Sequence, residues 1–144
     1  MLTKDKFIEQ ISGISDTQWD ALFAFIPVFE STKVFGGWTK TEQIGEGVFQ
    51  ISKCYYAQVV HDFIETVYAI DLILSFGRTE WRNGIKMLNT TDTDFDDLDP
   101  IALCKLMTIV VRNDRFTEGY MLRCFEEGIV LKILKSLERN TKLN

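Results

Sequence analysis

The stretch "IALCKLMTIVVRNDRFTEGYMLRCFEEGIVLKILKSLERN", residues 101–140, decides the fold because its apolar residues recur every three or four positions. Such spacing places them on one face of a helix, which is then buried. In the first run these residues are Leu103, Leu106, Met107 and Val110. The charged segment "RNDRFTEG" (112–119) and then Gly128 interrupt the pattern, so the stretch predicts three consecutive helices.

Local signals predict where these helices begin and end. Asp99 followed by Pro100 predicts the first start, because the carboxylate can accept from free amides and proline is favoured at the first helical position. We expect Thr117 to cap the second helix, with Glu118 in its first turn, where negative charge is favoured. Gly128 is expected to end that helix.

Helical signals are also present near the start of the chain. "SDTQ" at 15–18 is a capping box, in which the Ser15 hydroxyl accepts from a helical amide while Gln18 reaches back. Pro27 is expected to kink or end the helix that follows, because proline has no amide proton to donate.

The middle of the chain combines a long helical pattern with a glycine-rich segment. Apolar residues between Tyr55 and Phe76 predict a central helix about 33 Å long, with Gly77 as its cap. Residues 33–52 lack a helical period and predict a loop or small β-hairpin. We therefore predict a mostly α, compact orthogonal bundle of about six or seven helices, in a single domain over residues 1–144.

Composition limits the classes of function. The net charge is −5, and the acidic excess lies in residues 1–99, with 16 acidic and 8 basic side chains, against 5 and 8 in residues 100–144. This makes nucleic acid a poor partner. The most apolar run, 101–111, is too short to span a membrane. Three widely spaced cysteines predict reduced thiols in a bacterial cytoplasm, and no secretory signal is recognised.

The 108–137 segment "TIVVRNDRFTEGYMLRCFEEGIVLKILKSL" and "FAFIPVFE" at 23–30 resemble small prokaryotic proteins grouped as domain of unknown function 6508. The resemblance implies a helical fold and brings no activity. Thr117 departs from the cysteine of that family's motif, which argues against thiol chemistry there. The motif positions correspond here to Arg112, Arg115, Phe116, Glu118, Gly119 and Gly128.

The 112–118 corner has a structural and a functional interpretation. In the structural one, Arg115 pairs with Glu118, Arg112 braces Asp114 or Glu118, and Phe116 fills the core beneath. In the functional one, a guanidinium stays available to a ligand carboxylate or phosphate beside the amides that start the next helix.

Two hypotheses about function follow. In the first, the protein is a non-enzymatic binding or protein-interaction module that holds a small anionic ligand or a protein at Arg112, Asp114, Arg115 and Glu118. In the second, it is a small enzyme in which the two arginines position a phosphate or carboxylate while Glu118 or Asp114 does acid or base work. A homodimer is one of the partnerships considered, and no cofactor or metal is predicted.

Three other features give weaker signals. "DTDFDDLDP" from Asp92 begins like a calcium loop but lacks its glycine and its final glutamate, so we interpret it as a solvated acidic linker. His61, the only histidine, is expected to be exposed and bonded to Glu65, and no catalytic residue can be assigned. A basic stripe along the last helix is expected to be solvated or to meet an acidic partner; it comprises Lys132, Lys135, Arg139 and Lys142.

Overall fold

The computed structural model describes residues 2–76, 81–90 and 94–142. Within them the chain forms eight helices and four short strands, which confirms the predicted mostly α fold. The helices are α1 (Leu2–Ser12), α2 (Asp16–Phe23), α3 (Phe25–Ser31), α4 (Gln58–Ala69), α5 (Arg82–Leu88), α6 (Pro100–Asn113), α7 (Tyr120–Glu126) and α8 (Ile129–Lys142). The strands are β1 (Gly36–Trp38), β2 (Glu42–Gly45), β3 (Val48–Gln50) and β4 (Cys54–Tyr56).

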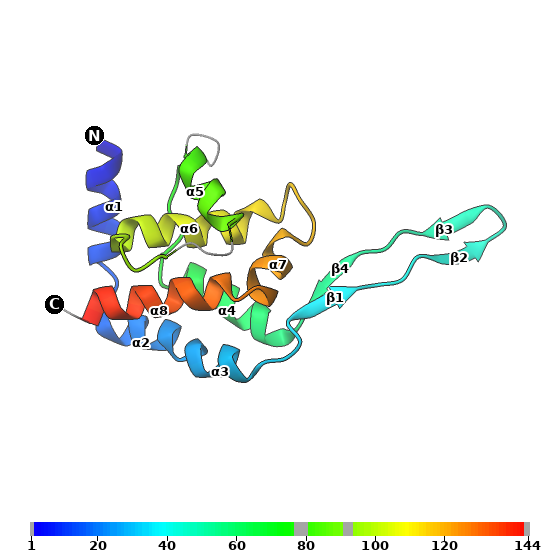
Figure 1. The fold of residues 1–144 in the computed structure, drawn as a ribbon, viewed down its shortest axis with the longest axis horizontal. Helices are drawn as coiled ribbons and strands as arrows, with labels where there is room; N and C mark the ends of the chain where they lie inside the picture. The colour runs from blue at the N-terminus through cyan, green and yellow to red at the C-terminus, as the bar shows by residue number, and fades with distance from the viewer. Residues whose placement is uncertain (1, 77–80, 91–93, 143–144) are drawn as a thin grey trace.

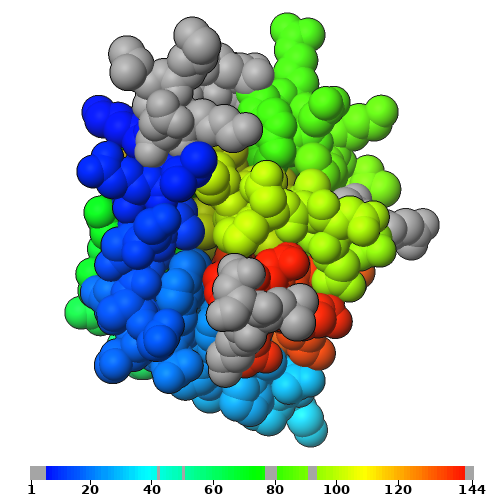
Figure 2. Space-filling model, turned by 90° about the vertical axis from the view of Figure 1, so that its left-hand side faces the viewer, coloured from blue at the N-terminus to red at the C-terminus, as the bar shows by residue number. Residues whose placement is uncertain are grey.

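Helices α6 and α8 form the centre of a helical body, and the other helices pack around them (Figure 1). Helix α6 contacts α1, α5, α7 and α8, while α8 also contacts α2 and α3. Figure 2 views one end of this body, where α1, α6 and α8 meet in a continuous surface. The apolar spacing that predicted these helices also predicts their buried residues, among them Leu103, Leu106, Met107, Val110, Ile133, Leu134 and Leu137.

The longest helices of the described residues, α6 and α8, have 14 residues each. A helix needs about 20 apolar residues to cross a bilayer. None of the described helices meets this requirement.

A cluster of phenylalanines joins α3, α4 and α7. The ring of Phe63 on α4 meets those of Phe25, Phe29 and Phe125 edge-on, with centroids 5.2 to 5.8 Å apart. Phe35, just before β1, contacts Phe29 and Phe125. Such ring pairs contribute about 0.5–1.5 kcal/mol beyond the area they bury. The cluster therefore ties the chain that enters the β-strands to the body.

The first helices begin and break largely as their sequence predicts. The capping box is confirmed, since the Gln18 amide donates to the Ser15 hydroxyl at 3.2 Å and the Ser15 amide to the Gln18 side chain at 2.9 Å. The break between α2 and α3 falls at Ala24, three residues before Pro27. Pro27 then lies in the first turn of α3, where its missing amide proton leaves no hydrogen bond unmade.

Helix α4 is shorter than predicted. The prediction of one helix from Tyr55 to Phe76 was wrong, because α4 has only 12 residues. Tyr55 belongs to β4, and the chain leaves the helix after Ala69. Gly77, the predicted cap, lies outside the described residues.

Asp71, rather than a glycine, ends α4. Its φ of 62° lies in the left-handed region. The Leu72 amide donates to the Val67 carbonyl at 3.2 Å and the Asp71 amide to the Tyr68 carbonyl at 3.1 Å, which is the Schellman arrangement. The apolar spacing continues past this end because Leu72 and Leu74 remain fully buried in a segment that is neither helix nor strand. That buried segment is why periodicity alone overestimates the helix.

The segment predicted as a loop or hairpin around 33–52 is a long β-hairpin, here called the arm (residues 34–56), which projects from the body (Figure 1). Near the body β1 pairs with β4, and at the tip β2 pairs with β3, both antiparallel. Gly47, with φ 71°, makes the turn at the tip. A Cβ at Gly36 would lie 2.2 Å from the Tyr55 carbonyl oxygen, so only glycine permits the pairing there.

The start of α6 follows the predicted signal. An Asp99 carboxylate oxygen accepts from the Ala102 amide at 2.8 Å, and Pro100 occupies the first helical position. The short helix α5 precedes the acidic segment that leads to α6.

Candidate functional site

Helices α6 and α7 are joined by a tight corner, residues 114–119. The Thr117 amide donates to the Asn113 carbonyl at 3.1 Å, which closes the end of α6. Gly119, with φ 89°, precedes the first residue of α7. The prediction that Thr117 caps this helix was therefore wrong, and Glu118 lies in the corner rather than in the first turn.

Asp114 supplies the cap that the sequence assigned to Thr117. Its Oδ1 accepts from the Gly119 amide at 3.1 Å, the Met121 amide at 3.2 Å and the Tyr56 hydroxyl at 2.9 Å. The Tyr56 oxygen in turn accepts from the Leu122 amide at 3.2 Å. The amides that the functional interpretation reserved for a ligand are thus already bonded within the chain.

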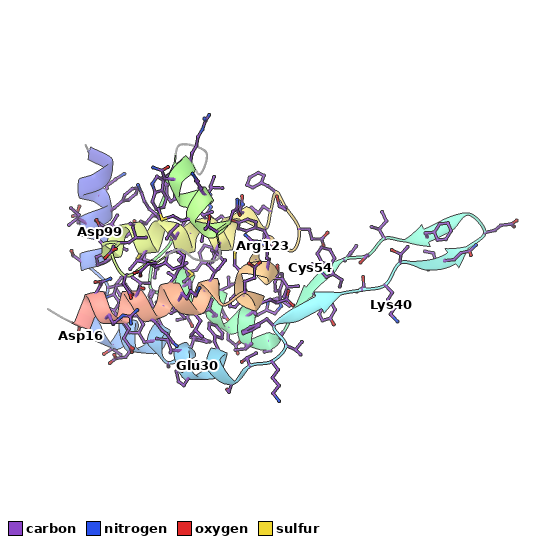
Figure 3. The ribbon with its side chains drawn as sticks, viewed as in Figure 1. Asp16, Glu30, Lys40, Cys54, Asp99 and Arg123 are labelled. Atoms are coloured by element: carbon purple, nitrogen blue, oxygen red, sulfur yellow. The ribbon has the colours of Figure 1, made fainter. Side chains whose placement is uncertain are left out.

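Glu118 contacts the arm rather than an arginine. Its Oε2 accepts from the Cys54 amide at 2.9 Å, at the base of the arm beside α7 (Figure 3). Among the described residues, no ion pair joins Arg115 to Glu118, and Arg112 braces neither acid. That part of the structural interpretation was wrong.

The two arginines line a pocket of about 180 Å³ from which both acids are missing. Neither guanidinium has a hydrogen bond or ion pair to another described residue. Phe116 is 64% exposed at this pocket, so the prediction that it fills the core was wrong. The lining residues are Phe76, Thr108, Ile109, Arg112, Arg115 and Phe116.

Lys105 contacts the ring of Phe76, one of the residues that line the pocket. Lys105 Nζ lies 5.2 to 5.5 Å from the ring centroids of Phe7, Phe76 and Trp81. Each such cation–π contact contributes about 0.5–1 kcal/mol at an exposed site. Lys105, the one charge within the apolar run of α6, therefore fixes Phe76 from the side of α1 and α5.

Among the described residues that line the pocket, Thr108 is the one other polar side chain, and its hydroxyl is already hydrogen-bonded within the chain. The Thr108 hydroxyl donates to the Cys104 carbonyl at 2.8 Å and accepts from the Leu74 amide at 3.0 Å. The pocket therefore offers a ligand two cationic groups against largely apolar walls.

The Tyr56 hydroxyl and the Cys54 thiol, which lie near Asp114, are both protonated at physiological pH. Burial raises the pKa of the Tyr56 hydroxyl, and its hydrogen bond to Asp114 raises it further. Burial also raises the pKa of the Cys54 thiol, against a lowering hydrogen bond with Tyr56. The thiols of Cys104 and Cys124 have raised pKa values for the same reason, that of Cys124 reaching about 12. Since the thiolate is the nucleophile, these cysteines are poor candidates for thiol chemistry.

Two residues that contact the corner are not identified by sequence reasoning. It places Tyr56 in the central helix and Trp38 in the loop or small β-hairpin, without a contact to residues 114–119. A Cβ at Gly119 would lie 2.4 Å from the Trp38 indole, so this glycine is needed both for its backbone and for the arm to approach. The available signal was the aromatic pair Tyr55 and Tyr56, which is typical of a strand.

The other candidate sites are not assembled in the described part of the chain. There, no group of three or more His, Cys, Asp or Glu could hold a metal ion. Asp92 of the calcium-like segment lies outside the described residues, and Asp94 accepts from the Asp96 amide at 2.9 Å. His61 is exposed on α4, but no hydrogen bond joins it to Glu65 among the described residues.

The basic stripe of α8 is partly paired within the chain. Lys135 forms an ion pair with Glu30 of α3 at 3.1 Å. Arg139 pairs with Asp96, whose carboxylate also accepts from the Ser136 hydroxyl at 2.6 Å. The predicted stripe thus contributes to packing the acidic segment and α3 against α8.

Most of the chain matches one known protein family. Residues 14–142 match the model of a family of unknown function (DUF6508). The chain belongs to this family. No curated protein and no solved structure matches the chain. Gly119 and Gly128, two of the positions in the resemblance described above, have positive φ values of 89° and 76°, which glycine adopts without a steric penalty.

Proposed function

We propose that this DUF6508 protein is a non-enzymatic binding module whose pocket at the end of α6 holds a small organic anion. The observation that carries the proposal is that Arg112 and Arg115 line one pocket with apolar walls, and that neither guanidinium has a hydrogen bond or ion pair to another described residue. Binding pockets combine mostly apolar walls with a few polar groups that fix orientation.

The chemistry of the walls suggests the class of ligand. Arginine binds carboxylate or phosphate through paired N–H donors. Phe76, Ile109 and Phe116 provide a surface for an apolar or aromatic portion of the same molecule. A volume of about 180 Å³ suits a ligand of the size of benzoate or phenyl phosphate. The net charge of −5 makes nucleic acid a poor candidate.

The alternative hypothesis, an enzyme using the same four residues, has less support. Acid or base catalysis would require Asp114 or Glu118 within hydrogen-bonding reach of the ligand held by the arginines. Asp114 instead caps α7, and Glu118 accepts from Cys54 in the arm.

The cytoplasmic location remains a prediction from the three cysteines, all of which are free thiols.

Calorimetric titration with four probes tests the proposal. Benzoate and phenyl phosphate should bind, whereas benzamide, which lacks the charge, and inorganic phosphate, which lacks the ring, should bind at least about tenfold more weakly. The double variant Arg112→Gln/Arg115→Gln should lose binding of both ring-bearing anions. Arg82→Gln, at an exposed position of α5 outside the pocket, is the matched control and should bind as the wild type does.

A purely structural role for the arginines predicts a different result. A cation in the last turn of a helix stabilises it by about 0.3–1 kcal/mol through the helix dipole. If the double variant loses thermal stability by this amount while the wild type binds none of the probes at millimolar concentration, the binding proposal is wrong.

A further inference from the structure

The arm carries most of the exposed large apolar side chains of the described residues. Seven of the eleven lie between Val34 and Tyr55, although this segment is a small part of the chain. Near the tip they are concentrated at Ile44, Val48, Phe49 and Ile51, which are 51% to 76% exposed. An exposed cluster of this kind marks an interaction surface more often than an ordinary surface region.

The arm also has unpaired strand edges. Each of its two sheets contains only two strands, so both outer edges present unpaired backbone groups. Side chains alternate along a strand, so Val48 and Phe49 point to opposite faces and neither face is wholly polar. Two-stranded ribbons are marginally stable in water by themselves. A strand from a partner would pair with the free backbone groups of one edge and would stabilise the ribbon.

Among the described residues, the contacts between the helical body and the arm lie at the base of the arm. There Cys54 bonds to Glu118, Tyr56 to Asp114, and Trp38 packs on Gly119. The tip extends well beyond the helices (Figure 1). Apolar residues near the tip are therefore available to another molecule.

The arm has four charged residues, Lys40, Glu42, Glu46 and Lys53, and their distribution favours a second copy of the arm as the partner. The tip carries exposed Glu46 in the turn, whereas exposed Lys40 and Lys53 lie nearer the body, and Figure 3 shows Lys40 projecting from the arm. Two arms laid antiparallel would place each acidic tip beside the lysines of the other, while two parallel arms would place Glu46 beside Glu46. A two-fold axis perpendicular to the arms produces the antiparallel arrangement, and two-fold symmetry is the commonest in homodimers.

We propose that the arm binds the arm of a second copy of this chain, antiparallel, pairing strand edges and burying the apolar residues near both tips. Each Glu46 then faces Lys40 and Lys53 of the other copy. The two pockets at Arg112 and Arg115 remain outside this contact, so the proposal does not depend on the proposed ligand.

Sedimentation velocity over a concentration series, up to about 100 µM, tests the dimer and its apolar contact. The wild type should shift from monomer to dimer, and Phe49→Ser/Ile51→Ser should remain monomeric. Tyr68→Ser, which alters an exposed aromatic residue of α4 in the body, is the control and should dimerise normally. Circular dichroism should give the same helix content for all of these proteins. A wild type that stays monomeric throughout, or a dimer that the arm variant does not weaken, overturns the proposal.

A charge exchange tests the antiparallel orientation. Glu46→Lys and Lys40→Glu should each weaken dimerisation by about tenfold, because each places like charges together at two symmetric positions. The double variant Glu46→Lys/Lys40→Glu should restore most of the affinity. Weakening by both single changes without recovery in the double variant would mean that the arm binds a different surface, and it would overturn the arm-to-arm contact.

Discussion

The helical body and the arm use the same kinds of residue in opposite ways. Phe63 on α4 is fully buried within a cluster of aromatic rings, whereas Phe49 on β3 is 59% exposed. The body is stabilised by burial, which acts cooperatively through one core. The arm is stabilised by strand pairing and by its contacts with the α6–α7 corner. The two regions should therefore respond differently to the same substitution.

The largest difference is expected between matched phenylalanine substitutions. Phe63→Ala should lower the free energy of unfolding by about 3–5 kcal/mol, because it opens a cavity in the core. Phe49→Ala should change the free energy of unfolding by less than about 0.5 kcal/mol, because the side chain that it removes is exposed on the arm. Urea denaturation followed by circular dichroism measures both, at a protein concentration low enough to keep the chain monomeric. Equal losses would show that Phe49 is buried in solution, which would contradict its exposed position on the arm.

The next largest effect is expected where the two regions meet. Asp114→Asn should destabilise the protein by about 2–3 kcal/mol, because it removes the charge from an acceptor of two amides and a hydroxyl. Asp97→Asn, at an exposed position of the acidic segment, is the control for loss of one negative charge. A similar small change in both variants would contradict the role assigned to Asp114 as the cap of α7.

The sequence predicts the body better than this junction. The helix starts at Ser15 and Asp99 and the stop at Gly128 depend on neighbours within a few residues, and each is confirmed. Apolar periodicity likewise predicts which residues of α6 and α8 are buried. Local signals suffice wherever the competing contacts are also local.

The errors about Thr117 and Glu118 have one physical cause, a competing partner that is distant in the sequence. Thr117 fits a helix cap, but Asp114 and Tyr56 satisfy the amides of α7 instead, and Tyr56 is 66 residues from Leu122. Glu118 fits an ion pair with Arg115, but the Cys54 amide is its partner. The arginines and acids of one eight-residue stretch are thus divided between a pocket and a junction. Only tertiary structure determines that division.

A pair of glycines offers a third comparison of body and arm. Gly128, between α7 and α8, and Gly47, at the tip of the arm, have φ values of 76° and 71°, and a Cβ on either would meet no atom within 4 Å. Alanine at either position is strained by about 1–2 kcal/mol in the left-handed region. Gly128→Ala should lower the global free energy of unfolding by this amount. Gly47→Ala should leave the melting temperature unchanged and accelerate amide hydrogen exchange in β2 and β3, since a locally unstable unit opens by itself.

The smallest effect is expected for a single hydroxyl group at the junction. Tyr56→Phe removes the hydroxyl that donates to Asp114 and accepts from the Leu122 amide. The substitution should lower the free energy of unfolding by about 1 kcal/mol at pH 7. Tyr55→Phe alters the neighbouring, exposed tyrosine and should cost less than about 0.5 kcal/mol. Urea denaturation of the two variants side by side measures the difference.

The same pair of variants should separate further at alkaline pH. An unfolded tyrosine ionises near pH 10, whereas burial and the Asp114 carboxylate raise the pKa of folded Tyr56 above that value. The unfolded chain therefore loses this proton first, so the contribution of Tyr56 is complete below pH 10 and declines as the pH rises above it. Between pH 9 and 11 the wild type and Tyr55→Phe should lose more stability than Tyr56→Phe, which has no hydroxyl to ionise at the junction. Parallel losses in all three proteins would mean that Tyr56 is not held against Asp114 in solution, and the arm would then lack its main polar contact with the body.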